Sequence, residues 1–376
     1  MTRPADGTLT LLLCGDVMLG RGIDQVLAHP GDPTLWEAYV RDARGYVELA
    51  DAASGPVPRP VPDTWPWGDA LADLVGDDRA VRVLNLETGI TRSPDVAPGK
   101  GIHYRMDPNN IGCLQVARPD VCVLANNHVL DFGRRGLAQT LQVLASAGLA
   151  SAGAGPDLAQ ARSPVVVEHD GTRVAVLALA HGSSGVPGSW AATQDRSGVA
   201  LLPDLSPSTA AVIGERVRAE KARGAVVVVS VHWGSNWGFG LPRDQVDFAH
   251  RLVDAGADVV HGHSSHHPRP LEVYAGRLVI HGCGDFVNDY EGIAGHEEYR
   301  GDLRLLHRVS LAADGALVAA ELLAYRSRRL RLERAGPDDV RWLEDVLDRT
   351  SRAHGVRVRR TAGHRLALDW EPEPRK

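Results

Sequence analysis

The fold of this sequence is indicated most clearly by one stretch, Asp258-Val259-Val260-His261-Gly262-His263-Ser264-Ser265-His266. A short apolar run leads into a glycine, and histidines then crowd the turn that follows. Open α/β sheets present their chemistry at the carboxyl ends of their strands. Neutral imidazoles that are closely spaced on one loop can converge on a metal ion. The stretch therefore predicts a strand end that carries a metal site.

Apolar runs rich in β-branched residues alternate with amphipathic segments along the rest of the chain. We expect strands at 8–14, 80–86, 121–125, 164–167, 173–180, 225–232, 259–261 and 278–282, and helices at 136–147, 209–223 and 242–255. Two later runs, 305–312 and 316–325, predict a hairpin. The alternation predicts a layered α/β fold, and the hairpin indicates a mixed sheet. We expect residues 8–330 to form one domain, with a helix and short strands from 331–376 packed on it.

Composition excludes several classes of function. The chain has 376 residues, is 44% hydrophobic and carries a net charge of −6, so it lacks the basic surface that nucleic-acid binding requires. No apolar stretch approaches the roughly 18 residues of a membrane span, and the first residues lack a signal-like apolar region. These features predict a cytoplasmic protein with no membrane partner. The four cysteines show no metal-binding spacing and are expected to be buried thiols. The oligomeric state is not determined by the sequence.

Four other expected strand ends also finish in residues that can bind a metal ion. Asp16 follows the first strand, although it would also suit the N-cap of a helix. Asn85 and Glu87 project from the same face of an extended chain, unless they mark an exposed strand edge. His232 ends the strand that begins at 225, with a core histidine bonded to backbone as the alternative.

The third strand end, Asn126-Asn127-His128, combines residues that are poor strand formers and poor core residues, which favours a role in a site. A further strand end contains Asp285 and is expected to line the same cleft. Together these side chains form a mixed oxygen and nitrogen donor set, which suits Mn, Fe or Zn better than Ca or Mg. A metal bound there would polarise an oxygen, activate water or orient a substrate.

The motifs, taken in this order, resemble the CapA family of poly-γ-glutamate capsule synthesis proteins, a branch of the calcineurin-like metallophosphoesterase superfamily. The matching pieces are Gly15-Asp16-Val17-Met18-Leu19-Gly20-Arg21, Asn85-Leu86-Glu87, Asn126-Asn127-His128 with Asp131 and Gly133, His232-Trp233-Gly234, and Gly262-His263 with His266. They span roughly residues 8 to 290. The resemblance implies a four-layer α/β/β/α sandwich of two mixed sheets with one or two divalent metal ions at the strand ends.

The resemblance also implies a set of ligands. One ion would be held by Glu87, Asn127, His232 and His263. A second would be held by Asp16 and His266 and would share Glu87. His128 matches the catalytic histidine that lies beside the metals in the superfamily.

Three positions depart from the superfamily's pattern. Met18 occupies the place of a histidine, Glu87 replaces a bridging aspartate, and the last motif is spaced as His263-x-x-His266. The CapA branch shares these changes, which argue against a phosphodiesterase centre with two ions. Asp285 stands where that branch more usually has asparagine, which adds a carboxylate near the site.

The resemblance implies an enzyme that acts on a peptide or γ-glutamyl substrate. CapA-like proteins include peptide epimerases of lasso-peptide pathways, in which a proton is removed from Cα on one face and delivered on the other. His128, Asp285 and His296 are the candidate acid and base groups. Two alternatives are hydrolysis of a phosphoester, which Met18 disfavours, and a scaffold without catalytic activity in polymer synthesis.

Four further residues are candidates for contact with a peptide or small-molecule substrate. Arg21 and Arg105 can pair with a carboxylate because the guanidinium fork matches its geometry, although both also suit an ordinary protein surface. Asn85 lies beside Glu87, and Trp233 directly follows His232. Trp233 would contribute to a hydrophobic wall for the substrate, with partial packing in the core as the alternative.

Overall fold

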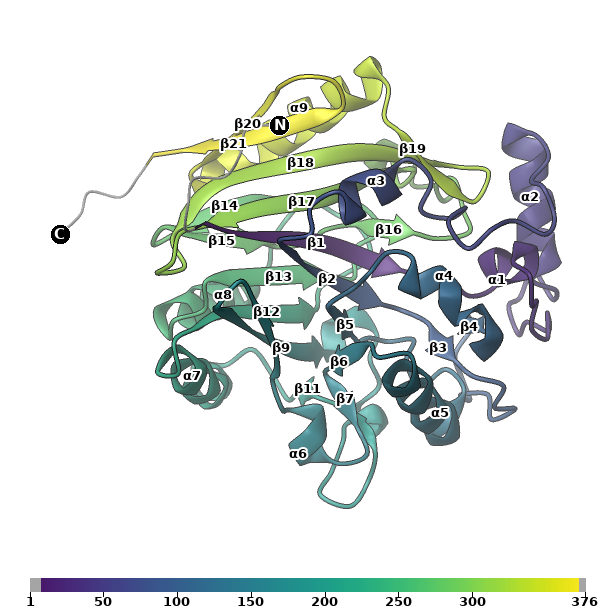
Figure 1. Cartoon of the computed structure of the whole chain (residues 1–376), viewed down its shortest axis with the longest axis horizontal. Helices are drawn as coiled ribbons and strands as arrows, with labels where there is room; N and C mark the ends of the chain where they lie inside the picture. The colour runs from purple at the N-terminus through teal and green to yellow at the C-terminus, as the bar shows by residue number, and fades with distance from the viewer. Residues whose placement is uncertain (1–7, 372–376) are drawn as a thin grey trace.

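The computed structural model describes residues 8–371, and two large mixed sheets dominate it (Figure 1). The first sheet has the order β20-β21-β18-β17-β1-β2-β5-β6, with β16 beside β1 and β19 beside β18. Its strands are β1 Leu9–Val17, β2 Ala80–Leu86, β5 Val121–Val123, β6 Ala150–Ala152, β16 Asp285–Val287, β17 Leu303–Leu311, β18 Leu317–Arg328, β19 Arg331–Arg334, β20 Val356–Arg360 and β21 Arg365–Trp370.

The second sheet has the order β11-β9-β12-β13-β15-β14, with β8 beside β9. Its strands are β8 Val165–His169, β9 Thr172–His181, β11 Leu201–Leu202, β12 Ala225–His232, β13 Val259–His263, β14 Leu271–Tyr274 and β15 Arg277–Ile280. Two small pairs join β3 (Gly89–Ile90) to β4 (Arg105–Met106) and β7 (Ala154–Gly155) to β10 (Gly198–Val199).

Helices connect and cover the strands. They are α1 Gly22–Val26, α2 Arg44–Ser54, α3 Ala70–Val75, α4 Ile111–Gln115, α5 Gly133–Ser146, α6 Leu158–Ala161, α7 Pro207–Lys221, α8 Arg243–Asp254 and α9 Pro337–Ser351, with 3-10 turns η1 Pro108–Asn110, η2 Gly182–Ser184, η3 Gly188–Trp190, η4 Glu297–Tyr299 and η5 Arg352–His354. Within residues 8–371, no helix is both long enough and apolar enough to cross a bilayer.

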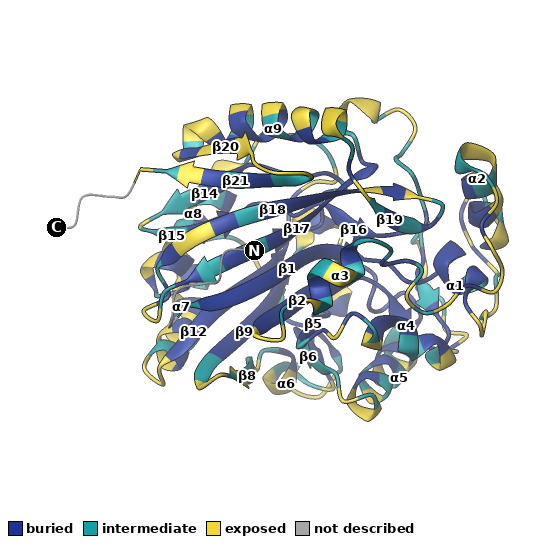
Figure 2. Ribbon diagram, turned by 45° about the horizontal axis from the view of Figure 1, so that its top comes forward, coloured by how far each residue is buried: buried dark blue, intermediate teal, exposed yellow. Residues whose placement is uncertain are grey.

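The valine run of β12 shows how the second sheet is packed. Successive residues of a strand point to opposite faces of its sheet. Val226 and Val228 belong to a core cluster shared with the first sheet, whereas Val227 and Val229 pack with side chains of α7 and α8. Both faces of β12 are therefore buried (Figure 2), which explains why this segment is continuously apolar rather than alternating.

These features confirm the α/β class with mixed sheets. The central strands β9, β12, β13 and β15 run parallel, while β17 and β18 form the expected antiparallel hairpin. The narrower assignment to a four-layer metallophosphatase sandwich remains a prediction. The four cysteines are buried and free, as predicted.

The C-terminal segment continues the first sheet. Strand β21 pairs with β18, β20 pairs with β21, and α9 contacts β20 and β14. A domain boundary at residue 330 remains a prediction.

Strand β13 extends two residues beyond the predicted end, so His261, Gly262 and His263 all lie inside the sheet. A side chain at position 262 would not fit there, because a Cβ atom would lie 2.5 Å from the carbonyl oxygen of Ile280 and 2.8 Å from Nε1 of Trp233. The glycine thus lets β13 run between its neighbours and bring His263 to the edge of the sheet.

Candidate metal centre

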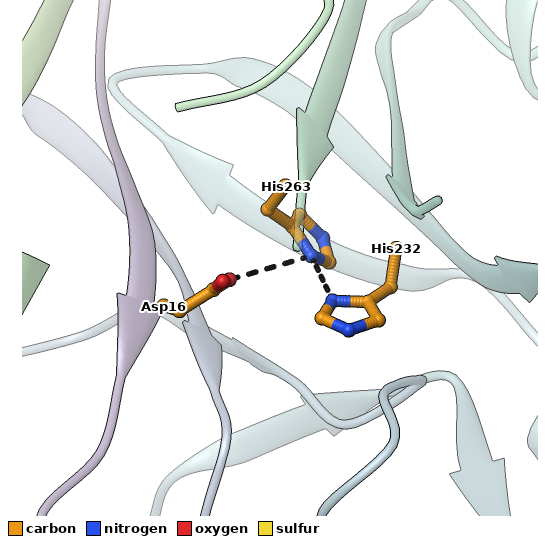
Figure 3. A group of neighbouring side chains, drawn as sticks. All are labelled: Asp16, His232 and His263. Carbon is orange, nitrogen blue, oxygen red and sulfur yellow. Dashed lines mark hydrogen bonds and ion pairs between the residues drawn. The ribbon is translucent and has the colours of Figure 1, made fainter. Parts of the chain in front are cut away.

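Three strand ends from the two sheets meet at one group of side chains. Asp16 lies on β1 of the first sheet, and His232 and His263 end β12 and β13 of the second. All three are buried, and one potential ligand atom from each lies within 4.8 Å of the others (Figure 3). The sequence predicted that these residues would approach one another, and the structure brings them together.

The ligand atoms face a common point. Nδ1 of His263 lies 3.7 Å from Oδ1 of Asp16 and 2.8 Å from Nδ1 of His232. Glu87 adjoins the group, with Oε2 4.0 Å from Nδ1 of His232. Asn85 donates from Nδ2 to Asp16 at 2.7 Å and to Glu87 at 3.0 Å, so one amide fixes both carboxylates.

Neighbouring groups orient the histidines. The hydroxyl of Ser230 lies 2.9 Å from Nε2 of His263 and 3.0 Å from Nδ1 of His261. His261 is anchored in turn, since its Nε2 donates to the carbonyl oxygen of Cys14 at 2.9 Å. Because Nε2 of His263 is occupied by Ser230, Nδ1 is the nitrogen that faces Asp16. Such outer partners fix the ring orientation of metal ligands.

The turn after β13 holds Asp16 through the backbone. Ser264 has φ 107°, a left-handed conformation that non-glycine residues rarely adopt, and its N–H donates to Oδ2 of Asp16 at 3.2 Å. Backbone strain of this kind, of order 1–3 kcal/mol, gathers at functional sites. The strained turn joins a carboxylate of the first sheet to the histidine strand of the second.

This donor set fits a divalent transition metal. Two imidazoles and one carboxylate are typical of catalytic zinc and non-haem iron sites, which leave coordination positions open. Burial and the surrounding imidazoles lower the pKa of His232 and His263 well below the usual range, so both are neutral, as ligands must be. Burial and Asp285 raise the pKa of Asp16 to about 7. Burial and Asp16 raise that of Glu87 well above its usual range, a cost that a bound cation would offset.

The structure groups the ligands differently from the sets that the family resemblance implies. Asp16 joins His232 and His263, whereas Oδ1 of Asn127 lies 3.1 Å from Nε2 of His232, the nitrogen not directed at His263. His266 pairs with Asp285 instead, at 3.1 Å. In the described part of the chain, Asp16, Glu87 and His266 do not form a second close ligand group. The geometry therefore favours one ion over two.

A cavity of about 930 Å³ lies beside this centre, although Asp16, His232 and His263 do not themselves line it. Glu87 and Asn127, which contact His232, are among its lining residues. Helix α2 forms an apolar wall with Tyr46, Leu49, Ala50 and Ala53, and residues 291–294 also line the cavity. Two histidines outside the ligand group, His128 and His266, also line it.

His128 belongs to a buried network with Asp131 and Lys100. Its Nδ1 lies 2.7 Å from Oδ2 of Asp131 and 2.9 Å from Nζ of Lys100, and its Nε2 lies 3.7 Å from Oε1 of Glu87. Lys100 also forms an ion pair with Asp131. Burial and the Lys100 cation lower the pKa of His128 to about 4. A neutral imidazole with one nitrogen fixed and the other turned to the cavity has the form of a general base.

His266 belongs to a second network, with Asp285 and Tyr290. Asp285 also accepts hydrogen bonds from Tyr290 and, at 2.9 Å, from Asn288. Burial lowers the pKa of His266, but the charge of Asp285 outweighs burial and raises the pKa above its usual value. This histidine therefore holds a proton more readily than His128 does.

The structure places the predicted arginines in networks of their own. Arg21 lines the cavity, but its guanidinium is bound by both oxygens of Asp289, by Glu37 and by the hydroxyl of Tyr46. Arg105 pairs with Asp32 at 3.0 Å and does not line the cavity. The guanidinium of Arg21 has no free edge for a substrate carboxylate, and that of Arg105 lies outside the cavity lining.

Three other candidates also have defined places. Asn85 is fully buried behind the carboxylates. Trp233 is buried against Phe248 of α8 and donates from Nε1 to the carbonyl oxygen of His281, so it packs in the core instead of at the cavity. His296 does not line the cavity. It stacks on Trp237 with ring centroids 4.1 Å apart, and Trp237 in turn contacts His266, which does line the cavity.

Sequence reasoning missed Lys100, Tyr104, Tyr290 and the α2 wall. A signal for Lys100 exists, since the 41 basic residues include only three lysines and this one lies between two glycines. The other positions carry no such signal, because their place at the cavity depends on how the loops fold.

The chain belongs to the bacterial capsule synthesis protein PGA_cap family, whose model matches residues 10–290. A probable polyglutamine synthesis accessory protein of Mycobacterium tuberculosis is 51% identical over 354 residues, which cover 93% of each chain. The capsule biosynthesis protein CapA of Bacillus anthracis is 26% identical over 75% of this chain and 60% of its own, and the PGA biosynthesis protein CapA of Bacillus subtilis is 26% identical over 76% and 64%. The CapA resemblance is thereby confirmed.

Proposed function

We propose that this protein is a metal-dependent enzyme that transfers a proton at Cα of a peptide or γ-glutamyl substrate and so inverts that centre. One observation carries the proposal: two histidines in different protonation environments line the same cavity. The order of the strands supports proton transfer on two faces of the substrate, because β16, β1, β2 and β5 are successive neighbours in the sheet. Asp16 and the Glu87 turn thus lie between Asp285, the partner of His266, and His128.

In this mechanism the two networks have complementary roles. When bound, the ion supplies positive charge to polarise the carbonyl next to Cα. His128, held neutral and oriented by Asp131, accepts the proton from one face. His266, whose proton is favoured by Asp285 and backed by the Tyr290 hydroxyl, delivers a proton to the other face. The α2 wall would exclude water from the reacting carbon.

The substrate class is taken from the names of the relatives, which refer to polyglutamine synthesis and PGA biosynthesis, and from the γ-glutamyl substrate that the family resemblance implies. A γ-glutamyl oligomer is consistent with the cavity, whose apolar α2 wall suits methylene groups.

Phosphoester hydrolysis is less well supported as an alternative. Met18 lines the cavity at the place where the resemblance predicts a histidine in phosphoesterases. The one arginine that lines the cavity, Arg21, is already paired with Asp289 and Glu37. A doubly charged phosphoryl group would also meet the carboxylates of Asp289 and Glu291, which line the same cavity.

Solvent isotope exchange tests the proposal. The metal-free protein is reloaded with Mn²⁺, Fe²⁺ or Zn²⁺ and incubated in D₂O with a γ-linked L-glutamate oligomer or an α-linked peptide. Mass spectrometry measures deuterium at Cα, and chiral chromatography after hydrolysis measures D-residues. We expect metal-dependent uptake of deuterium together with inversion in at least one substrate.

Other results would contradict the proposal. Turnover of nitrophenyl phosphate without isotope exchange, abolished in His232→Ala, would identify a phosphatase. A protein that binds no metal and melts at the same temperature in chelator would fit a scaffold instead.

A further inference from the structure

A second group of potential metal ligands lies outside the cavity. Glu272, His281 and His354 each place one ligand atom within 4.8 Å of the others, and none of them belongs to the centre described above. They come from three separate segments: β14, the residue after β15, and the turn η5 that follows α9. Chain segments about 80 residues apart thus meet at one point.

The β14–β15 ladder explains how two of the ligands face one another. Glu272 pairs with Val279 in the antiparallel register, and His281 lies two residues beyond Val279, on the same face. Oε2 of Glu272 lies 2.8 Å from Nε2 of His281 and 4.0 Å from Nδ1 of His354. Glu272 and His281 are buried, whereas the side chain of His354 retains 21% of its exposure. The group is therefore built in the interior and open to solvent on one side.

An outer partner orients the carboxylate. His250 of α8 contacts the other oxygen of Glu272, with Nε2 2.7 Å from Oε1, and its ring stacks on Tyr274 with centroids 3.8 Å apart. Burial would raise the pKa of Glu272, but His281 and His250 outweigh it, and the pKa lies below its usual range. Nε2 is the nitrogen of His281 that faces Glu272, whereas Nδ1 is buried without a hydrogen-bond partner among the described residues.

We propose that Glu272, His281 and His354 bind a Zn²⁺-class divalent ion. With metal–ligand bonds of about 2.0–2.1 Å, neighbouring ligands of a tetrahedral ion lie about 3.3 Å apart. The separations of 2.8 and 4.0 Å lie on either side of that value, so small side-chain movements would seat an ion. Two imidazoles and one carboxylate suit zinc, and water would complete the coordination on the exposed side of His354.

The position of this site indicates a structural role. His354 follows α9, and Ser351 at the end of that helix accepts a hydrogen bond from the backbone N–H of Leu271 at 3.0 Å. An ion at the cluster would add a second link between the C-terminal segment and the edge strand β14. Metal binding to a folded site adds to the stability of the segments it joins.

Metal stoichiometry tests the site without reference to activity. The full-length protein is stripped with chelator, titrated with Zn²⁺ and analysed by elemental analysis after gel filtration. We expect about two equivalents of zinc in the wild type and about one in either His354→Ala or His263→Ala. His354→Cys keeps a zinc ligand and should retain both equivalents. His29→Ala, which removes an exposed histidine outside both groups, is the matched control.

A spectroscopic arm isolates the second site. Co²⁺ added to His263→Ala should give the visible absorption of a tetrahedral ion, and the further change His354→Ala should abolish it. Zn²⁺ should also raise the melting temperature of His263→Ala but not that of the double variant. Equal zinc content in the wild type and His354→Ala, or an unchanged cobalt spectrum in the double variant, would overturn the assignment.

Discussion

The two ligand groups use the same chemistry in different surroundings. Each combines two histidines with one carboxylate, but the group at Asp16 lies between two sheets and contacts Glu87 and Asn127, which line a large cavity. The group at Glu272 lies at a sheet edge and includes His354 of the C-terminal turn, and neither its residues nor its outer partner His250 lines that cavity. Ligand type alone therefore does not distinguish a catalytic centre from a structural one. The two are distinguished by whether a substrate can reach the ligands and whether proton carriers lie nearby.

Removing a ligand from the group at Asp16 is the strongest test of the difference between the two groups. In His263→Ala we expect metal affinity at that centre to fall by more than about 100-fold, because loss of an outer partner alone lowers affinity by up to about 100-fold. We also expect isotope exchange to be lost. Isothermal titration and the D₂O assay measure the two effects. His354→Ala is the matched control and should retain full exchange. Loss of exchange in both variants would show that the two groups do not differ as proposed.

Removing a proton carrier should separate chemistry from metal binding. His128→Ala is expected to lower the rate of exchange by about 10²- to 10⁴-fold, the usual contribution of a positioned acid or base. Metal content should remain that of the wild type, because His128 is not a ligand. The D₂O assay with elemental analysis of the same sample checks both values. A wild-type rate would remove His128 from the mechanism.

The outer partners of the cavity centre should have a smaller effect. Ser230→Ala removes the hydroxyl that fixes His261 and His263, and we expect metal affinity to fall by about 10- to 100-fold. Exchange should return at saturating metal, because the ligands remain. Titration of exchange rate against metal concentration measures this shift. An unchanged titration midpoint would mean that Ser230 does not orient the ligand.

The smallest expected effect concerns the anchoring of the C-terminal segment by Asp348. This carboxylate accepts hydrogen bonds from Nε of Arg357 at 2.7 Å and from the N–H of Val358 at 3.0 Å. Asp348→Asn should reduce the free energy of unfolding by about 1 kcal/mol, because the two arginine partners of Asp348, Arg357 and Arg352, are more than half exposed and water screens their charge.

The pH dependence of that anchor has a definite sign. The hydrogen bond from Arg357 lowers the pKa of Asp348 below its usual value. Its stabilising contribution is therefore present above the unfolded pKa of about 3.9 and is lost as the pH falls toward the lower folded pKa. Urea unfolding of the wild type and Asp348→Asn at neutral and acidic pH should show curves that converge as the pH falls. A constant difference would contradict this account.

Much of the fold was predictable because the strands have strong local patterns. The bounds 80–86 and 225–232 were predicted to the residue, because both runs are largely apolar and every residue in them is buried. Helix α2 was missed, because only Tyr46, Val47 and Ala50 of its residues are buried and its packing against α1 forms only in the folded chain. The role of Glu272 was missed for a related reason: its ligand neighbour His354 lies in a tail that the sequence alone does not place.

The sequence by itself determined which residue types occupy the strand ends, because apolar runs followed by Asp, Asn, Glu or His are a local pattern. It thereby indicated the α/β class, the family and the side chains Asp16, His232 and His263. Only the tertiary structure decided that Asp16 joins both histidines, that His266 turns to Asp285, and that Arg21 is already paired. The physical reason is that local patterns fix the strands, whereas the approach of two sheets fixes which polar groups share a buried space.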